Sequence, residues 1–259
     1  NINADIVLAT DPDADRLACA LPHPEKGWNA PPENLALNGN QIGALLCHYI
    51  LSQKKAKEDL PENGVICKTI VTTDLTALIG RAFGLKVVDN LLVGFKYIAD
   101  VIEKLPKDKT FLFGTEESHG YLFGSFIRDK DAASAAIPLV ECTALLKTHG
   151  RTIQSYLDEI YQEFGYFQEI QKSIIWKGAL GHSEMVKTML ELRQNPPLEI
   201  GGHPIVEIHD RQTGKAYNLK TGTLKSIEGA RGNVIILTFT AQGHTRVTIR
   251  PSGTEPKIK

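Results

Sequence analysis

Between residues 34 and 150 the sequence alternates between short apolar runs typical of β-strands and longer amphipathic runs typical of helices. This alternation is the feature that most constrains the fold. Apolar strands followed by helices are typical of βαβ units, in which a helix connects two parallel strands. The pattern therefore predicts an α/β domain of three layers around a mostly parallel sheet.

The elements expected up to residue 164 have the following ranges. Expected strands are Asp5–Ala9, Val65–Val71, Lys86–Asp89 and Thr110–Phe113, and Leu17–Leu21 is a further apolar run. Expected helices are Gln41–Lys57, a helix capped within Thr72–Asp74 and ending at Phe83, Gly94–Leu105, Asp131–Thr148 and Thr152–Phe164.

After Tyr166 the pattern changes to runs of strand character around one helix, which predicts a smaller α+β unit. The expected helix is Ser183–Leu192, and the expected strands are Ile170–Trp176, Ile205–His209, Val234–Ala241 and Thr245–Ile249. The Pro/Gly/Asn-rich stretch His23–Glu33 reads as a domain boundary. We therefore expect three parts: the end of one α/β domain (residues 1–32), a complete α/β domain (33–164) and the α+β domain (165–259). Because both ends fall inside expected elements, we expect a piece of a longer protein.

Charge and cysteine content exclude several classes of function. The formal net charge is −1, which gives no electrostatic reason to expect nucleic acid or an anionic membrane as a partner. The four cysteines are widely separated, without zinc-ligand spacing, and lie among apolar neighbours. With no apolar run long enough to span a bilayer, these features favour a cytoplasmic location. The oligomeric state cannot be read from the sequence.

The TDPDADR segment places carboxylates at alternate positions after an apolar run. In a tight turn Asp11, Asp13 and Asp15 can converge on one hard cation, and Arg16 can offset their charge or contact a phosphate. The alternative is a solvated acidic turn that caps its own backbone. An EF-hand is excluded, because that motif requires glycine at Arg16 and glutamate at Pro22.

Two further polar segments follow the expected strand Thr110–Phe113. The GTEESHG segment (residues 114–120) offers acceptors and a hydroxyl suited to a sugar, unless it is only a polar loop that caps the next element. In the RDKD segment (residues 128–131), Lys130 is either part of a solvated charge cluster at a helix start or an acid/base group. The second reading predicts a depressed pKa for Lys130.

The RPSGTEPK segment (residues 250–257) surrounds a glycine with hydroxyl residues and brackets the turn with cations. Backbone N–H groups in such a concave turn can bind phosphate. The alternative is an ordinary Pro/Gly turn that carries surface charges. The spacing matches neither a Walker loop nor a dinucleotide-binding fingerprint.

In their order along the chain, TDPDADR, LNGNQIGALL, VGFKYI, GTEESHG, RDKDAASAA and RPSGTEPKIK resemble the α-D-phosphohexomutases. The resemblance covers the whole chain. It implies that the three parts correspond to the end of domain 2, to domain 3 and to domain 4 of that family. It also implies a Mg²⁺ ion in the catalytic centre and a phosphorylated serine in domain 1, to which nothing in this sequence corresponds.

The resemblance also implies roles for residues of this chain. Metal ligands would be Asp11, Asp13 and Asp15, and catalytic groups would be Arg16, near the phosphoserine, and Lys130. Sugar contacts would come from Glu116, Ser118 and the segment containing Gly94, Phe95 and Lys96. The non-reacting phosphate would be bound by Arg250, Ser252, Gly253, Thr254 and Lys257. The position of His119 departs from the GExSGH pattern of phosphomannomutases and favours the phosphoglucomutase and phosphopentomutase branch, so His119 is not among the expected catalytic residues.

The implied activity of the intact enzyme is an intramolecular phosphotransfer between the 1- and 6-positions of a hexose phosphate, glucose first, through a sugar bisphosphate. A phosphopentomutase, acting between the 1- and 5-positions, is the alternative within the family. The chain alone is expected to bind a sugar phosphate without turning it over. A phosphatase-like hydrolase with Asp11 as nucleophile is disfavoured, because it would leave the sugar and phosphate loops without a role.

Overall fold

The computed structural model of the 259-residue chain describes residues 4–178, 180–240, 243–253 and 255–259. It divides into two compact units, residues 1–169 and 170–259. The first unit includes the segment before residue 33 along with the central α/β region, and the predicted boundaries within and around it stay predictions. The α/β class predicted from the alternating pattern is confirmed.

The first unit contains two sheets and five α-helices within its described residues. Its strands are β1 (Val7–Thr10), β2 (Leu17–Ala20), β3 (Ala36–Leu37), β4 (Gly64–Thr69), β5 (Lys86–Leu91), β6 (Thr110–Glu116) and β7 (Gly120–Phe123). Its helices are α1 (Gly39–Ala56), α2 (Asp74–Ala82), α3 (Phe95–Glu103), α4 (Ala132–Thr148) and α5 (Ile153–Phe164), with a short 3₁₀ turn at Pro32–Asn34.

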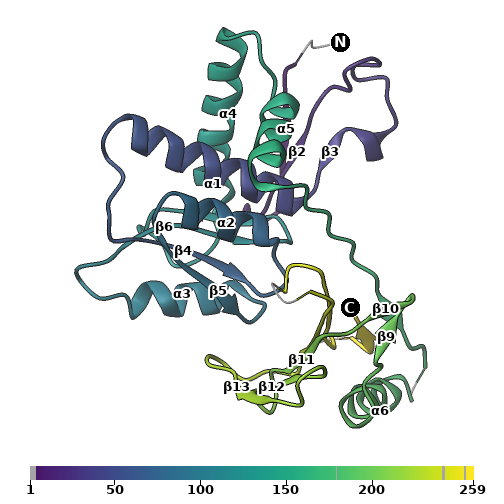
Figure 1. Ribbon diagram of the computed structural model, residues 1–259. Coiled ribbons are helices and arrows are strands. Elements are labelled where there is room, and N and C mark those ends of the chain that lie inside the picture. The colour runs from purple at the N-terminus through teal and green to yellow at the C-terminus, as the bar shows by residue number, and fades with distance from the viewer. Residues whose placement is uncertain (1–3, 179, 241–242, 254) are drawn as a thin grey trace. The chain divides into compact units, whose positions relative to one another are not determined.

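The central sheet has the strand order β5-β4-β6-β7. Strands β5 and β6 both run parallel to β4, and β7 runs antiparallel to β6. Helices α1 and α2 cover one face and α3 covers the other (Figure 1). The largest core lies under α1, α2, α4 and α5, and a second core lies between the sheet and α3. The prediction of three layers and a mostly parallel sheet therefore holds, with one antiparallel edge strand.

Capping explains where the three longest helices of the first unit begin. At the start of α1 the Asn38 side chain accepts from the Gln41 N–H and the Gln41 side chain accepts from the Asn38 N–H, which forms a capping box. Asp131 accepts from the first turn of α4, and Thr152 caps α5. These caps satisfy backbone N–H groups that a helix end leaves unpaired.

The second unit is an α+β unit, as the pattern predicts. Its elements are β8 (Ile174–Ile175), α6 (Gly181–Gln194), β9 (Glu199–Ile200), β10 (His203–Pro204), β11 (Glu207–Asp210), β12 (Lys215–Asn218), β13 (Leu224–Ser226), β14 (Ile235–Thr238), β15 (Arg246–Ile249) and β16 (Lys257–Ile258). Five of these strands form an antiparallel sheet in the order β13-β12-β11-β14-β15. The expected strand Ile170–Trp176 is wrong over most of its length, because only its residues 174–175 pair, with β16.

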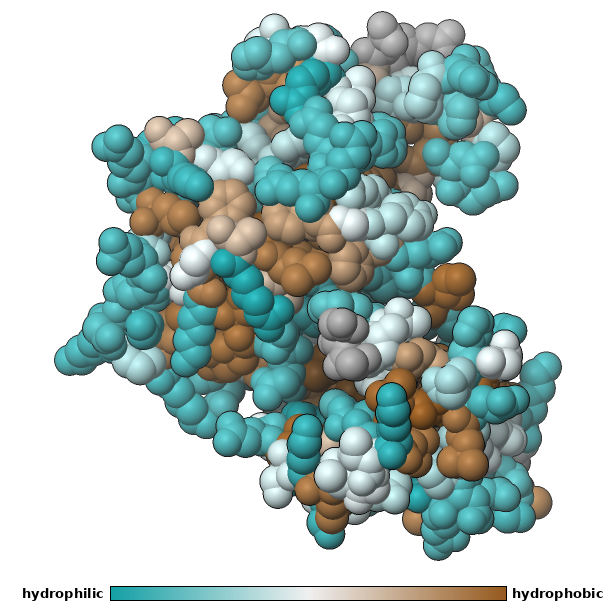
Figure 2. Space-filling model, viewed as in Figure 1, coloured by the Kyte–Doolittle hydropathy of each residue, from teal (hydrophilic) through white to brown (hydrophobic). Residues whose placement is uncertain are grey.

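The described surface carries both polar and apolar groups. Figure 2 shows a mostly hydrophilic face on which apolar patches are separated by polar side chains. All four cysteines are buried free thiols, as expected from their apolar neighbours. Among the described helices, none combines the length and apolar character needed to cross a membrane.

Candidate functional site

The acidic segment forms the tight connection between the antiparallel strands β1 and β2, where Thr10 pairs with Leu17. Its shape depends on the first carboxylate, because Asp11 Oδ1 accepts the Asp15 N–H at 3.2 Å and the Arg16 N–H at 3.0 Å. Ala14 takes a left-handed conformation with φ of 55°, which closes the turn. These backbone hydrogen bonds overcome the effect of burial and lower the pKa of Asp11.

The three predicted metal ligands converge in this turn. One carboxylate oxygen from each of Asp11, Asp13 and Asp15 lies within 4.8 Å of the others. Asp15 Oδ1 is a buried acceptor without a hydrogen-bond partner in the structure. A hard divalent cation takes such oxygen ligands, so these residues fit the Mg²⁺ that the family resemblance implies.

Lys130 lies directly beside this turn. Its Nζ atom is 2.7 Å from Asp15 Oδ2 and 3.2 Å from Asp129 Oδ1, and the side chain is 14% exposed. The Nζ atom also lies 5.8 Å from the centre of the Phe95 ring. Burial lowers the pKa of Lys130, but the hydrogen bonds to Asp15 and Asp129 outweigh burial and raise the pKa above its ordinary value. The expected depressed pKa is therefore wrong for this arrangement, because two carboxylates stabilise the charged amine.

Backbone contacts join the acidic turn to the predicted sugar-binding segment GTEESHG (residues 114–120), called the sugar loop below. The Leu17 N–H donates to the His119 carbonyl at 3.0 Å, and Arg16 forms an isolated antiparallel bridge with Gly120. At the other side of the turn the Ala132 N–H donates to the Ala14 carbonyl at 3.0 Å. The predicted metal, sugar and lysine segments therefore meet within the first unit.

The sugar loop is shorter than expected. Strand β6 continues through Glu116 and β7 starts at Gly120, so only residues 117–119 form the connection of a β-hairpin. The expected strand end at Phe113 is wrong because residues 114–116 go on pairing with β4 or β7. Ser118 lies in this connection and is half-buried.

Glu116 points inward from the end of β6. It is 4% exposed, and its Oε1 atom accepts the Gly94 N–H at 2.9 Å. Burial raises the pKa of Glu116, and the Gly94 hydrogen bond opposes the shift only in part. The predicted sugar-binding residues Glu116 and Gly94 are therefore in direct contact.

Gly94, Phe95 and Lys96 lie in three different environments. Gly94 precedes α3 with φ of 122°, a conformation that favours glycine. The Phe95 side chain is 4% exposed and packs in the second core, so it is not available to solvent. Lys96 is exposed, and its Nζ atom lies 5.2 Å from the centre of the Tyr97 ring.

The sugar loop lies against the first turn of α1, a support that the sequence analysis did not identify. A Cβ atom added at Gly39 would lie 2.1 Å from the Glu117 carbonyl oxygen and 2.8 Å from the His119 nitrogen. The Tyr121 hydroxyl donates to the Gly39 carbonyl at 3.1 Å. The sequence signal was Gly39, the first glycine of LNGNQIG, because an ordinary helix start does not require a glycine at this position.

The phosphate loop lies in the second unit and follows β15. Arg250 and Lys259 exchange backbone hydrogen bonds of 3.1 and 2.9 Å, and the Ser252 N–H donates to the Lys257 carbonyl at 2.8 Å. The Ser252 N–H is therefore already paired, so a phosphate nest would need other N–H groups. Gly253 is exposed, with open space around its Cα atom. The expected contact Thr254 lies outside the described residues.

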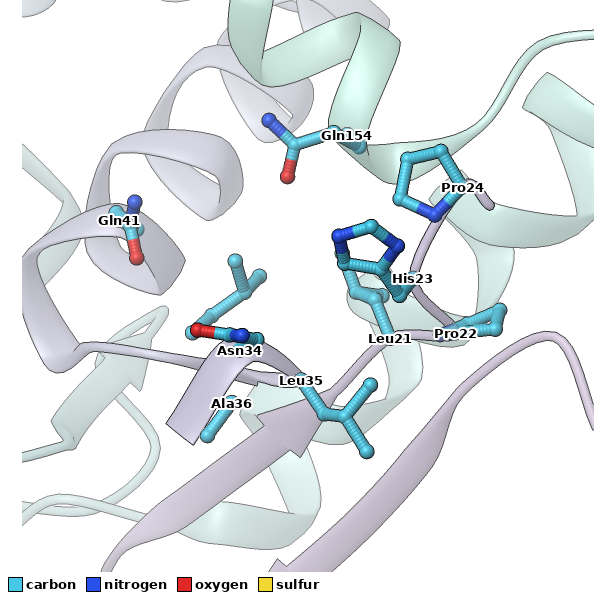
Figure 3. A pocket seen from close by; sticks show the side chains of 10 residues that line it. Leu21, Pro22, His23, Pro24, Asn34, Leu35, Ala36, Gln41 and Gln154 are labelled. Atoms are coloured by element: carbon cyan, nitrogen blue, oxygen red, sulfur yellow. The ribbon is translucent and has the colours of Figure 1, made fainter. Parts of the chain in front are cut away.

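Two cavities in the first unit lie away from these loops. The first has a volume of about 170 Å³, and His23, Gln41 and Gln154 border it together with neighbouring residues (Figure 3). The second, of about 180 Å³, lies beside Tyr49, Cys142 and Tyr156. Neither contains a residue predicted for the metal, the sugar or the phosphate, so neither is the candidate site.

Comparison with known proteins identifies relatives of this chain. Residues 38–164 match the family described as "Phosphoglucomutase/phosphomannomutase, alpha/beta/alpha domain III". A phosphoglucomutase from Staphylococcus aureus is 36% identical over 257 residues, which is 99% of this chain and 44% of that protein. One from Staphylococcus haemolyticus is 33% identical over 259 residues, or 100% of this chain and 45% of that protein. The chain belongs to the phosphoglucomutase/phosphomannomutase family.

Solved structures show that the fold is that of the family. The open form of pp63/parafusin, a phosphoglucomutase from Paramecium, matches with a TM-score of 0.59 at 16% identity over 98% of this chain and 39% of that chain. A phosphoglucomutase/phosphomannomutase family protein from Burkholderia thailandensis matches with a TM-score of 0.54 at 15% identity over 98% and 41% of the two chains. The chain spans about half the length of the curated relatives it matches.

Proposed function

We propose that this chain supplies the metal, sugar and phosphate-binding parts of a mutase that interconverts the 1-phosphate and 6-phosphate of a hexose, glucose first. The observation that carries the proposal is the 2.7 Å contact between Lys130 Nζ and Asp15 Oδ2. It joins the acidic turn to the lysine segment, and the Arg16–Gly120 bridge adds the sugar loop. The residues proposed for the cation, the proton transfer and the sugar thus lie in one unit, which supports the proposal because phosphoryl transfer to a sugar requires all three.

Asp11, Asp13 and Asp15 would hold Mg²⁺ in this proposal, and the buried Asp15 oxygen that lacks a hydrogen-bond partner among the described residues supports that choice. A bound divalent cation supplies positive charge beside the oxygens of a transferring phosphoryl group. Arg16, whose Nε atom is 3.7 Å from both Asp11 and Asp15 carboxylates, offsets the negative charge of the turn. Its exposed guanidinium can also contact a phosphate.

Transfer between the two positions needs two half-reactions. In the first, a sugar hydroxyl oxygen bonds to the phosphorus of a phosphoserine, the serine P–O bond breaks, the sugar hydroxyl loses its proton and the leaving serine oxygen gains one. The resulting bisphosphate reorients within the site, and its other phosphoryl group is transferred back to the serine. The phosphoserine comes from outside these 259 residues. Lys130, whose two carboxylate partners keep its amine charged, is the proposed acid that gives the serine oxygen its proton and recovers one from the sugar hydroxyl.

Glu116 and Ser118 are the proposed acceptors for sugar hydroxyls. Glu116 supports this role because its Oε1 atom is fixed by the Gly94 N–H while the same carboxylate stays next to Gly120 and Lys130. Arg250, Ser252, Gly253 and Lys257 are proposed for the non-reacting phosphate. Their loop would bind the phosphate group and not the sugar, so it would hold a hexose phosphate in either orientation.

The chain itself tests the proposal. With glucose 1-phosphate, glucose 1,6-bisphosphate and Mg²⁺, we expect no formation of glucose 6-phosphate in a coupled dehydrogenase assay, and turnover by the chain alone would show that a phosphoryl acceptor is present in it. Isothermal titration with glucose 1,6-bisphosphate should show binding. Free glucose is the control that lacks phosphate, and ribose 1,5-bisphosphate tests the phosphopentomutase alternative.

A further inference from the structure

Lys68 is a fully buried cation at the carboxyl end of the central strand β4. Its residue is 1% exposed, although it lies within an otherwise apolar strand. Its Nζ atom donates to the Thr72 carbonyl at 3.0 Å and to the Thr69 carbonyl at 3.3 Å, and it lies 3.0 Å from Asp74 Oδ1. The three acceptors match the three N–H donors of an ammonium group.

Burying such a pair is costly. Removing each ion from water costs several kcal/mol, and apolar residues of similar size often give equal or greater stability. A lysine at this position therefore needs a reason other than stability. The reason we find is geometric, because an apolar side chain would leave the Thr69 and Thr72 carbonyls without this donor.

Those carbonyls belong to the turn that joins β4 to α2. The Thr72 N–H closes the turn onto the Thr69 carbonyl at 3.1 Å, and the Thr73 N–H donates to the Asn40 side chain of α1 at 3.0 Å. Asp74, the first residue of α2, provides the carboxylate beside Lys68. The ammonium of Lys68 thus joins both ends of the turn to the strand.

The same turn contacts the sugar loop. The hydroxyls of Thr69 and Thr72 are 2.8 Å apart, which fixes their orientation. Thr69 Oγ1 in turn lies 3.5 Å from Glu117 Oε2, at the start of the 117–119 connection. The backbone of Glu117 also approaches Gly39 of α1 closely. The connection that carries Ser118 is therefore in contact with both α1 and the turn.

We propose that Lys68 is a positioning residue, which sets the place of the sugar loop through the Thr69–Thr73 turn and thereby its affinity for a sugar phosphate. This inference rests on the proposed function, since it names a further determinant of the same site. Lys68 does not contact the substrate in this proposal. It acts through the Thr69–Glu117 contact.

Two variants of the 259-residue chain separate this role from folding. Thr69→Val keeps the shape of the side chain but removes the hydroxyl that faces Glu117. Lys68→Met combined with Asp74→Asn removes both charges, so no buried charge is left without its partner. Ile79→Val is the matched control, because Ile79 is fully buried in α2 and loses a methyl group without touching these hydrogen bonds.

Affinity for glucose 1,6-bisphosphate in the presence of Mg²⁺ is measured by isothermal titration. We expect about a three- to tenfold loss for Thr69→Val, the usual effect of one hydrogen bond. The loss should be at least as large for the Lys68/Asp74 double variant. A triple variant that combines Thr69→Val with Lys68→Met and Asp74→Asn should lose little more affinity than that double variant, because both changes act through one contact. Amide chemical shifts of residues 117–120 should move in these variants and stay in place in Ile79→Val.

The outcomes distinguish the two levels of the proposal. A folded Lys68/Asp74 variant with unchanged loop shifts and wild-type affinity would overturn the positioning role while leaving the proposed function in place. Losses that simply add in the triple variant would also overturn it. If the wild-type chain binds no glucose 1,6-bisphosphate, the proposed function itself is wrong. If, in addition, the amide shifts of residues 117–120 are the same in the variants as in the wild type, the positioning role is wrong as well.

Discussion

Lys130 Nζ lies 2.7 Å from Asp15 Oδ2, so the amine proposed for proton transfer is paired with a carboxylate proposed for the metal. This contact spans 115 positions of the chain, the difference between the two residue numbers. It lies at the meeting point of the β1–β2 turn and the segment before α4.

Metal binding should depend on the exposed carboxylate of the turn. Asp13→Asn is expected to weaken Mn²⁺ binding by roughly tenfold or more, because a hard cation loses one charged oxygen ligand. Stability should change little, since Asp13 is exposed. Isothermal titration with Mn²⁺ measures the affinity. Asp5→Asn, which removes an exposed acid paired with Lys147, is the control and should bind Mn²⁺ as the wild type does.

Glu116 should make stability fall as pH rises. Its pKa is raised in the folded chain, so the folded state holds a proton that the unfolded state releases above its ordinary pKa of 4.5. The stability contributed by the protonated form is therefore complete below pH 4.5 and is lost as pH rises through the folded pKa. Glu116→Gln keeps an acceptor for the Gly94 N–H and should be more stable than wild type at pH 7 but not at pH 4. Urea unfolding at both pH values measures this, and equal differences at both would contradict it.

The close approach at Gly39 should tolerate no side chain. Gly39→Ala places a Cβ atom 2.1 Å from the Glu117 carbonyl oxygen, so the backbone of the loop or of α1 must move. We expect a loss of about 1–3 kcal/mol in the free energy of unfolding, typical of overpacking. Gln53→Ala, in the same helix, is the control and should stay within about 0.5 kcal/mol of wild type. Denaturant unfolding compares the two, and a neutral Gly39→Ala would show that the approach is not close.

His48 should make the chain less stable in mild acid. Burial lowers the pKa of His48 despite the nearby charges of Glu163 and Glu159, and its Nδ1 atom lies 2.6 Å from the Tyr156 hydroxyl. The unfolded chain therefore takes up a proton near pH 6.5 while the folded chain does not, so stability is present above that pH and is lost as pH falls towards the folded pKa. His48→Gln should reduce the difference in unfolding free energy between pH 7 and pH 5. An unchanged difference would assign the acid sensitivity to other groups.

The alternation of strand and helix patterns was sufficient to predict the α/β class and the helices of the first unit. Periodicity and caps act over a few residues, so α1 and α5 were predicted within one or two residues of their ends. The short strands of the second unit were harder, because strands of two residues such as β8 and β16 exist only through their partner.

The convergence of Asp11, Asp13 and Asp15 could also be predicted from the sequence alone, because these carboxylates are close neighbours along the chain. Only the tertiary structure brought Lys130 to Asp15, placed Gly39 under the Glu117 carbonyl and surrounded Lys68 with acceptors. It also decided that the pKa of Lys130 is raised, since the carboxylates that stabilise its charge include one from a distant turn. Local chemistry is written in consecutive residues, whereas contacts between distant segments depend on how the whole unit packs.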